Sequence, residues 1–151
     1  MNYQKTVSNV NLASYAGDWY VQATRPTVFE KDVYNGLENY KIEGDKIDIT
    51  FSYNKGGFDG EKKVVKQKGT VYNQKTNAHW KVSPFWPLKF DFLVIALADD
   101  YSWTAVGVPS TKYLWVMTRK KTVAKDQVDE MLQSIASKGY PINDIVYISH
   151  Q

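Results

Sequence analysis

Short segments in which apolar and polar residues alternate constrain the fold of this chain more than any other feature. Such a period of two places successive side chains on opposite faces of a β-strand. Eight segments of this kind, joined by short connections, lie at 19–24, 39–42, 47–53, 63–72, 79–82, 92–98, 103–107 and 113–119. Regular short strands predict an antiparallel barrel or sandwich, and eight of them can close into a barrel that has no free edges.

A single segment near the C-terminus has the period of a helix instead. Its apolar residues recur every three or four positions, at Val128, Met131, Leu132 and Ile135. Gly139 stands where a helix C-cap glycine belongs, and Pro141 prevents the helix from continuing. The remaining INDIVYIS segment is long enough for one short strand.

These patterns predict one domain over residues 1–151. Its fold class is all-β: an eight-stranded antiparallel up-and-down barrel at residues 17–119, a C-terminal α-helix at 125–138 packed outside the barrel, and a short final strand at 144–149. A barrel of eight strands leaves an interior that holds side chains or one small ligand.

Composition excludes several classes of function. The chain has no cysteine, which rules out disulfides, thiolate metal sites and a cysteine nucleophile. A net charge of +3 does not require a nucleic-acid partner, and we expect none. No apolar run approaches the roughly 20 residues of a membrane-spanning helix. The first residues lack the apolar core of a signal peptide, so we expect either a protein that is not exported or one whose leader has been removed.

Motifs spread along the chain resemble the lipocalin family, and in particular its bacterial outer-membrane branch related to apolipoprotein D. They are YAGDWY, FEKDVYNGLENY, WKVSPFWPLKFDFLVIALADDYSW and KYLWVMTR, and the resemblance covers residues 12–151 in the right order. Gly17 and Trp19 match the family's Gly-x-Trp on the first strand. Asp100 and Tyr101 match its Thr-Asp-Tyr turn, and Arg119 matches the arginine that ends its eighth strand.

The chain departs from the branch at a few positions. Asp18 and Asp99 stand where threonine is common, which should not disturb a barrel. The branch carries a lipidated N-terminal cysteine after a signal, and this sequence has neither. The resemblance implies the cell envelope, in the outer membrane or periplasm, whereas a chain that is full length as given would be cytoplasmic.

Tracing the strands up and down the barrel places Trp19 and Arg119 at the same end. The resemblance implies that an arginine over the indole face closes the barrel floor there, a cation–π contact worth about 0.5–2 kcal/mol. Trp19 therefore serves as a plug, or alternatively contacts a ligand directly. The loops at the opposite end form an open rim.

Alternation also predicts which side chains point into the barrel and line a ligand site. They are Tyr40, Ile49, Phe51, Val65, Gln67, Val82, Phe92, Val94, Ala105, Tyr113 and Trp115. The same register turns Ile42, Ile47, Tyr53, Val71, Trp80, Ala96, Gly107 and Met117 inward. It turns Leu114 and Val116 outward, toward the apolar face of the predicted helix.

The predicted rim combines aromatic and cationic residues: Arg25, Phe29, Tyr34, Lys55, Phe58, Trp86 and Lys112. Such a rim suits entry of a lipid, a head-group site, or contact with a membrane or a second copy; ordinary solvated loops are the alternative. The basic EKKVVKQKG segment is similarly either a solvated outer face, a membrane or head-group contact, or a nucleic-acid surface.

An apolar interior predicts a binding protein for a small hydrophobic ligand, most simply a fatty acid or lysophospholipid held for storage, transport or membrane maintenance. The alternatives are a barrel filled by its own aromatic side chains, an interaction module that uses the rim, and an enzyme acting on bound lipid. We expect no enzyme and no cofactor, because no catalytic motif is present and His79 and His150 lack metal-ligand spacing. Glu38 is the one inward carboxylate that an enzyme could use.

Overall fold

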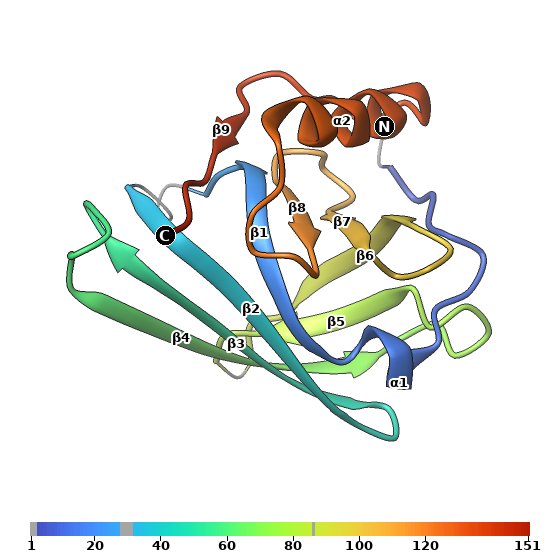
Figure 1. The fold of residues 1–151 in the computed structure, drawn as a ribbon. Helices are drawn as coiled ribbons and strands as arrows, with labels where there is room; N and C mark the ends of the chain where they lie inside the picture. Colours follow the sequence, from blue (N-terminus) through green and yellow to red (C-terminus); the bar gives the residue numbers. More distant parts are fainter. Residues whose placement is uncertain (1–2, 28–31, 86) are drawn as a thin grey trace.

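Eight strands form a closed barrel in the computed structural model, which describes residues 3–27, 32–85 and 87–151 (Figure 1). In chain order they are β1 (Gly17–Arg25), β2 (Val33–Glu43), β3 (Lys46–Lys55), β4 (Lys62–Val71), β5 (His79–Ser83), β6 (Phe90–Leu97), β7 (Trp103–Gly107) and β8 (Leu114–Thr118). Each pairs antiparallel with the next, and β1 pairs with both β8 and β2, which closes the ring. The predicted up-and-down barrel is therefore confirmed.

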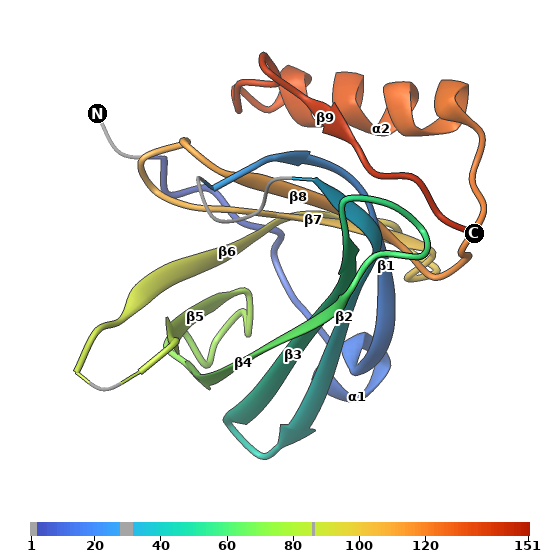
Figure 2. The ribbon, with the colours of Figure 1, turned by 90° about the vertical axis from the view of Figure 1, so that its left-hand side faces the viewer.

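Three further elements lie at the ends and outside of the barrel. Helix α1 (Leu12–Tyr15) crosses one end, α2 (Lys125–Ser137) packs along the outside, and β9 (Val146–Tyr147) pairs with β1 (Figure 2). As the sequence predicts, the chain leaves α2 through Gly139, which has a φ of 91°. Alternation gave no sign of α1, a single turn whose N-terminus is capped by Asn11. Neither described helix is long and apolar enough to cross a membrane.

The up-and-down order gives the barrel two different ends. One end, here called the closed end, holds α1 and the turns after β2, β4 and β6. The other, here called the mouth, holds the connections after β1, β3, β5 and β7. Strand β2 is longer than the segment 39–42 predicted from alternation, because a bulge between Tyr34 and Leu37 interrupts its period.

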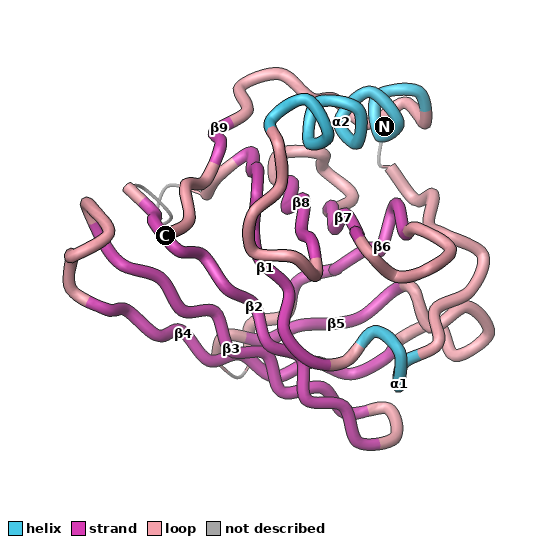
Figure 3. The backbone as a smooth tube through the Cα atoms, in the orientation of Figure 1, coloured by secondary structure: helices cyan, strands magenta, loops and turns pink. Residues whose placement is uncertain are grey.

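Two separate hydrophobic cores flank the barrel wall. The inner core fills the barrel and includes Trp19, Tyr40, Phe51 and Trp80. The outer core lies between the barrel and α2, where Leu114 and Val116 meet Leu132 and Ile135 as predicted. Figure 3 shows the single helical layer that covers this part of the sheet.

Three residues predicted to point inward belong to the outer side of the wall instead. A bulge between Val94 and Ala96 shifts the register of β6, so Ala96 packs in the outer core. On β7 the predicted inward positions are wrong by one residue: Ala105 lies in the outer core and Val106 in the inner one. Gly107 faces the ring of Tyr140, where a Cβ would come within 2.7 Å. Ala96, Ala105 and Gly107 are small, which allows α2 and the Tyr140 ring to pack close to the barrel strands.

Candidate functional site

The closed end of the barrel is sealed by Arg119 and Trp19. The guanidinium carbon lies 3.7 Å from the centre of the indole ring, and Trp19 is fully buried. Arg119 also donates to four main-chain oxygens, those of Ser14, Tyr15, Ala16 and Asp18, at 2.7–3.1 Å. Trp19 donates from Nε1 to the oxygen of Tyr15 at 2.8 Å. These bonds hold α1 across the barrel floor and support the structural role of Trp19.

The other motif residues also hold the closed end together. The main-chain N–H of Asn11 donates to the Tyr101 hydroxyl at 2.8 Å, which ties the segment before α1 to the turn after β6. Asp100 accepts a hydrogen bond from the main-chain N–H of Ser102 at 3.0 Å, and hydrogen bonds from Ser102 lower the pKa of this carboxyl. Gly17 has a φ of 101°, which favours glycine at the start of β1.

Aromatic rings fill the half of the interior next to this floor. Tyr15, Tyr40 and Trp80 lie within 5.5–5.6 Å of one another between ring centres, and Phe92 stacks on Trp80 at 5.0 Å. Tyr15 and Tyr40 are buried, and burial raises the pKa of both phenols. This half of the barrel is a packed protein core.

The mouth half of the interior exposes apolar side chains to solvent. Residues directly opposite each other in an antiparallel pair share a face of the sheet. Val65 stands opposite Phe51, and Phe90 opposite Val82. Phe51 and Val82 are part of the inner core, yet Val65 is 41% exposed and Phe90 is 51% exposed. Inward-facing apolar surface is therefore left uncovered at the mouth.

Strand pairing is also interrupted beside this surface. Within the described chain, β4 pairs with β5 only over 68–71, and its mouth half, 62–67, pairs with β3 alone. In Figure 1, β4 runs well beyond the end of β5. The unpaired edge lies next to the connection between β5 and β6, whose described residues include the exposed Phe85 and Leu88. The ladder of hydrogen bonds between β4 and β5 is thus confined to the half of β4 near the closed end.

Most of the predicted ligand-lining set does face the interior. Seven of its members belong to the inner core or pack against it: Tyr40, Ile49, Phe51, Val82, Phe92, Val94 and Trp115. Val65 and Gln67 share this face through their partners Phe51 and Ile49. Tyr113 lies just before β8, with its ring 6.3 Å from that of Trp115. Ala105 is the exception, and its place in the outer core removes it from the site.

The predicted rim is only partly assembled as expected. Lys55 and Lys112 are exposed at the mouth, and the rings of Tyr34 and Phe58 meet edge to face at 5.2 Å. Arg25 is instead engaged on the outside, where it donates to the main-chain oxygens of Thr111 at 2.7 Å and Pro141 at 3.4 Å. Phe29 and Trp86 lie outside the described residues.

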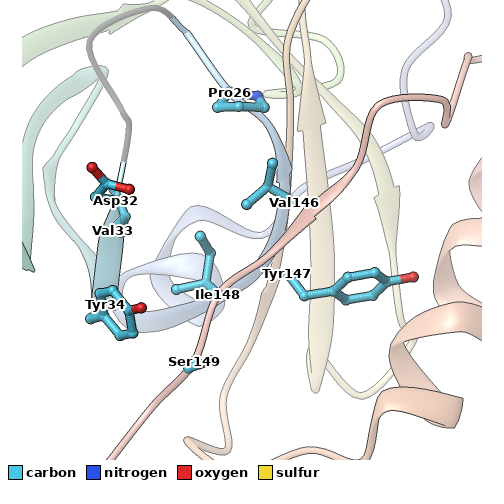
Figure 4. Close-up of a pocket in the computed structure, with 8 residues that line it drawn as sticks. All are labelled: Pro26, Asp32, Val33, Tyr34, Val146, Tyr147, Ile148 and Ser149. Atoms are coloured by element: carbon cyan, nitrogen blue, oxygen red, sulfur yellow. The ribbon is translucent and has the colours of Figure 1, made fainter. Parts of the chain in front are cut away.

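The C-terminal segment closes a seam in the barrel that the sequence did not reveal. β1 and β2 pair only near the closed end, from Gly17 to Tyr20, and diverge toward the mouth. There, Ile148 donates from its N–H to Gln22 at 2.9 Å, Asn35 donates to the oxygen of Ser149 at 2.9 Å, and the Ile148 side chain joins the inner core. A hollow of about 380 Å³ remains between this segment and β2, beside Val33 and Tyr34 (Figure 4).

Two charged residues in the described strands, Glu38 and Lys63, have partners on the inner face of the sheet. Glu38 stands opposite both Trp19 and Phe51, so the predicted inward register of this carboxylate is correct. Lys63 stands opposite Tyr53, which packs against the inner core. Lys63 is not among the predicted site residues. The spacing of two residues between Lys63, Val65 and Gln67 nevertheless indicates that all three point to the same face of the strand.

The two histidines make ordinary structural contacts. His79 shares Asp91 with Lys81, at 2.8 Å from Nε2 to the carboxylate. His150 lies 2.7 Å from the main-chain oxygen of Val21, and burial lowers its pKa. Among the described residues, no three histidine or carboxylate groups are clustered so that they could hold a metal ion.

Comparison with known proteins identifies the family. A family model described as a lipocalin-like domain matches residues 10–150. The chain belongs to this family. Outer membrane lipoprotein Blc of Vibrio cholerae is 28% identical over 148 residues, which cover 97% of this lipocalin and 86% of that protein. Temperature-induced lipocalin-1 of Arabidopsis thaliana is 26% identical over 151 residues, with 93% and 80% covered. The family resemblance read from the motifs is thus confirmed.

Solved structures share the fold of this lipocalin. Insecticyanin from the tobacco hornworm Manduca sexta matches it with a TM-score of 0.72 at 15% identity, covering 96% of this chain and 83% of that one. Apocrustacyanin C2 matches with a TM-score of 0.72 at 14% identity, covering 93% and 80%. At such low identity these likenesses concern the fold alone.

Proposed function

We propose that this lipocalin binds a single-chain lipid, a fatty acid or lysophospholipid, in the mouth half of its barrel. The observation that carries the proposal is the exposed inward-facing surface of Val65 and Phe90. An acyl chain lying against them would bury apolar surface on both partners, at about 0.8 kcal/mol for each methylene removed from water. The packed rings beneath limit how deep the chain can go.

Family membership supports the coarser part of this proposal, which is that a small hydrophobic ligand occupies the barrel. Insecticyanin and apocrustacyanin share the fold but at low identity, so they do not indicate a ligand for this chain. The role proposed for the bound lipid is storage, transport or membrane maintenance. Because relatives are named outer membrane lipoproteins, we propose the cell envelope as the place where it acts.

A second candidate function is docking to a membrane or to another copy through the rim. Phe85 is 67% exposed and Leu88 is 41% exposed on the connection after β5, beside the unpaired edge of β4. Such contact would serve ligand delivery rather than replace ligand binding. Centrifugation with liposomes and measurement of the mass in solution would separate the two partners.

Two neighbouring valines on β4 provide a matched test of lipid binding. Val65 faces the interior, whereas Val64 stands opposite Ser52 on the outer face and is 52% exposed. A Val65→Asp variant should bind palmitate and lysophosphatidylcholine at least about tenfold more weakly, because a carboxylate would lie in the acyl path. Val64→Asp should bind both like the wild type.

Isothermal titration of the delipidated protein, with native mass spectrometry of the freshly purified protein, would provide these measurements. Equal affinities for the two variants would place the lipid elsewhere on the molecule. A wild-type protein that purifies bare and binds neither lipid would refute the proposed function and favour a filled barrel.

A further inference from the structure

Lys63 is an inward-facing cation on the wall of the proposed acyl site. It stands directly opposite Tyr53, which stacks on Phe51 at 5.2 Å and packs against the inner core. The next inward residue along β4 toward the closed end is Val65, whose exposed side chain belongs to the proposed acyl path. The register therefore places Lys63 one inward position nearer to the mouth than Val65, on the side where the head group of a bound single-chain lipid would lie.

The other lysines of β4 face away from the interior. Lys62, Lys66 and Lys68 stand opposite Asn54, Thr50 and Asp48 on the outer face of β3. Lys68 is paired with Asp48 there at 3.5 Å. The alternating directions of side chains along β4 thus separate its lysines. Lys62, Lys66 and Lys68 face outward, and Lys63 faces the interior.

The partner of Lys63 in this structure is weakly held. Its Nζ lies 3.2 Å from Glu61 Oε1, and the two side chains are 38% and 76% exposed. Ion pairs that are this exposed contribute little, because water competes with both charges. An incoming anion can therefore replace the Glu61 carboxylate without a large cost.

Charge along the inner face also favours one orientation of a ligand. Glu38, opposite Phe51, lies deeper than Lys63. Burial raises the pKa values of Tyr15 and Tyr40 near the floor, and the nearby Glu38 carboxylate adds to this effect. When ionised, the Glu38 carboxylate repels an anionic head from the deep part of the barrel, while a positive group near the mouth attracts it. The acyl chain would enter first and the head would remain at Lys63.

We propose that the Lys63 ammonium binds the anionic head, a carboxylate or a phosphate, of the single-chain lipid in the barrel. This inference rests on the proposed function and makes the protein selective for anionic lipids over neutral ones of the same chain length. Lys63 is thereby a specificity-determining residue.

The test compares Lys63→Met with Lys66→Met, which removes the same charge from the outer face of the same strand. Each protein is titrated with palmitate, with a phosphate-bearing lysophosphatidic acid and with neutral monopalmitoylglycerol. Lys63→Met should weaken binding of the anionic lipids about tenfold or more, as expected for loss of a charge-assisted hydrogen bond. It should leave monopalmitoylglycerol within about twofold.

Lys63→Arg, which keeps the charge, should retain most of the affinity, and Lys66→Met should bind every ligand like the wild type. A larger loss for palmitate would identify a carboxylate head, and a larger loss for the phosphate lipid would identify a phosphate head. Equal effects of Lys63→Met and Lys66→Met would overturn the role of Lys63 while the acyl site stands. A wild-type protein that binds none of the three lipids would overturn both proposals.

Discussion

Removal of the Arg119 side chain tests whether the closed end depends on this one residue. Arg119 joins β8 to α1 and β1 through four hydrogen bonds to main-chain oxygens and a cation–π contact with Trp19. A hydrogen bond to a charged group contributes about 1.5–3 kcal/mol, and the cation–π contact about 0.5–2 kcal/mol. The four bonds share two nitrogens and are partly exposed, so their contributions do not add.

We therefore expect Arg119→Met to lower the free energy of unfolding by about 3–4 kcal/mol. For a domain of this size, that is a fall in melting temperature of roughly 6–16 °C. Arg119→Lys should recover part of the loss, because it keeps the charge but not the planar fork of donors. Lys120→Met, a neighbouring exposed cation, serves as the control for net charge.

Urea unfolding followed by tryptophan fluorescence would give these free energies, provided that the slope with urea is unchanged among the variants. Hydrogen exchange should also show faster exchange at the amides of Tyr15 and Ala16, which close the turn of α1. A loss below about 1 kcal/mol for Arg119→Met, as for an exposed ion pair, would refute this account of the barrel floor.

Three further perturbations test other parts of the structure. Gly107→Ala places a Cβ 2.7 Å from the Tyr140 ring and should cost about 1–3 kcal/mol in urea unfolding; an unchanged midpoint would show that the ring moves freely. Ile148→Ala removes a side chain that is 7% exposed and should cost about 2 kcal/mol or more; a loss near zero would mean that the seam does not need it. His150 is half-buried and burial lowers its pKa, so the unfolded chain takes up a proton at this residue before the folded protein does as the pH falls below about 6.5. Stability should therefore decrease from pH 7.5 to 5.5 by more in the wild type than in His150→Gln, and parallel pH profiles would contradict this.

The fold could be read from the sequence where alternation runs without a break. In β3, Ile47, Ile49 and Phe51 are buried at every second position, as the pattern predicts. Helix α2 could be predicted equally well, because Val128, Leu132 and Ile135 recur with the period of a helix and form one buried face. These signals are local, so a single sequence contains them.

The site was harder to predict because its register depends on features without a local signal. The bulge between Val94 and Ala96 shifts the register of β6, and Gly107 of β7 faces the ring of Tyr140, which lies far away in the sequence. Lys63 could have been found from its phase with Val65, but a run of lysines looks like a solvated surface. Ile148 docks between β1 and β2, more than a hundred residues away in the sequence. No pattern in the residues around Ile148 predicts this contact.

The seam closed by the C-terminal segment has a consequence for how the barrel folds. His150 meets Val21 across a sequence separation of 129 residues, and Gln151 meets Asn35 across 116. Contacts this distant carry a large loop-closure entropy and are typical of chains that fold slowly. Until the segment docks, β1 and β2 are joined only over Gly17–Tyr20, and their mouth halves face each other as unpaired edges. Strand edges of this kind are where chains pair with one another and aggregate, so late docking of the last few residues would leave the folding barrel open to aggregation that the finished barrel resists.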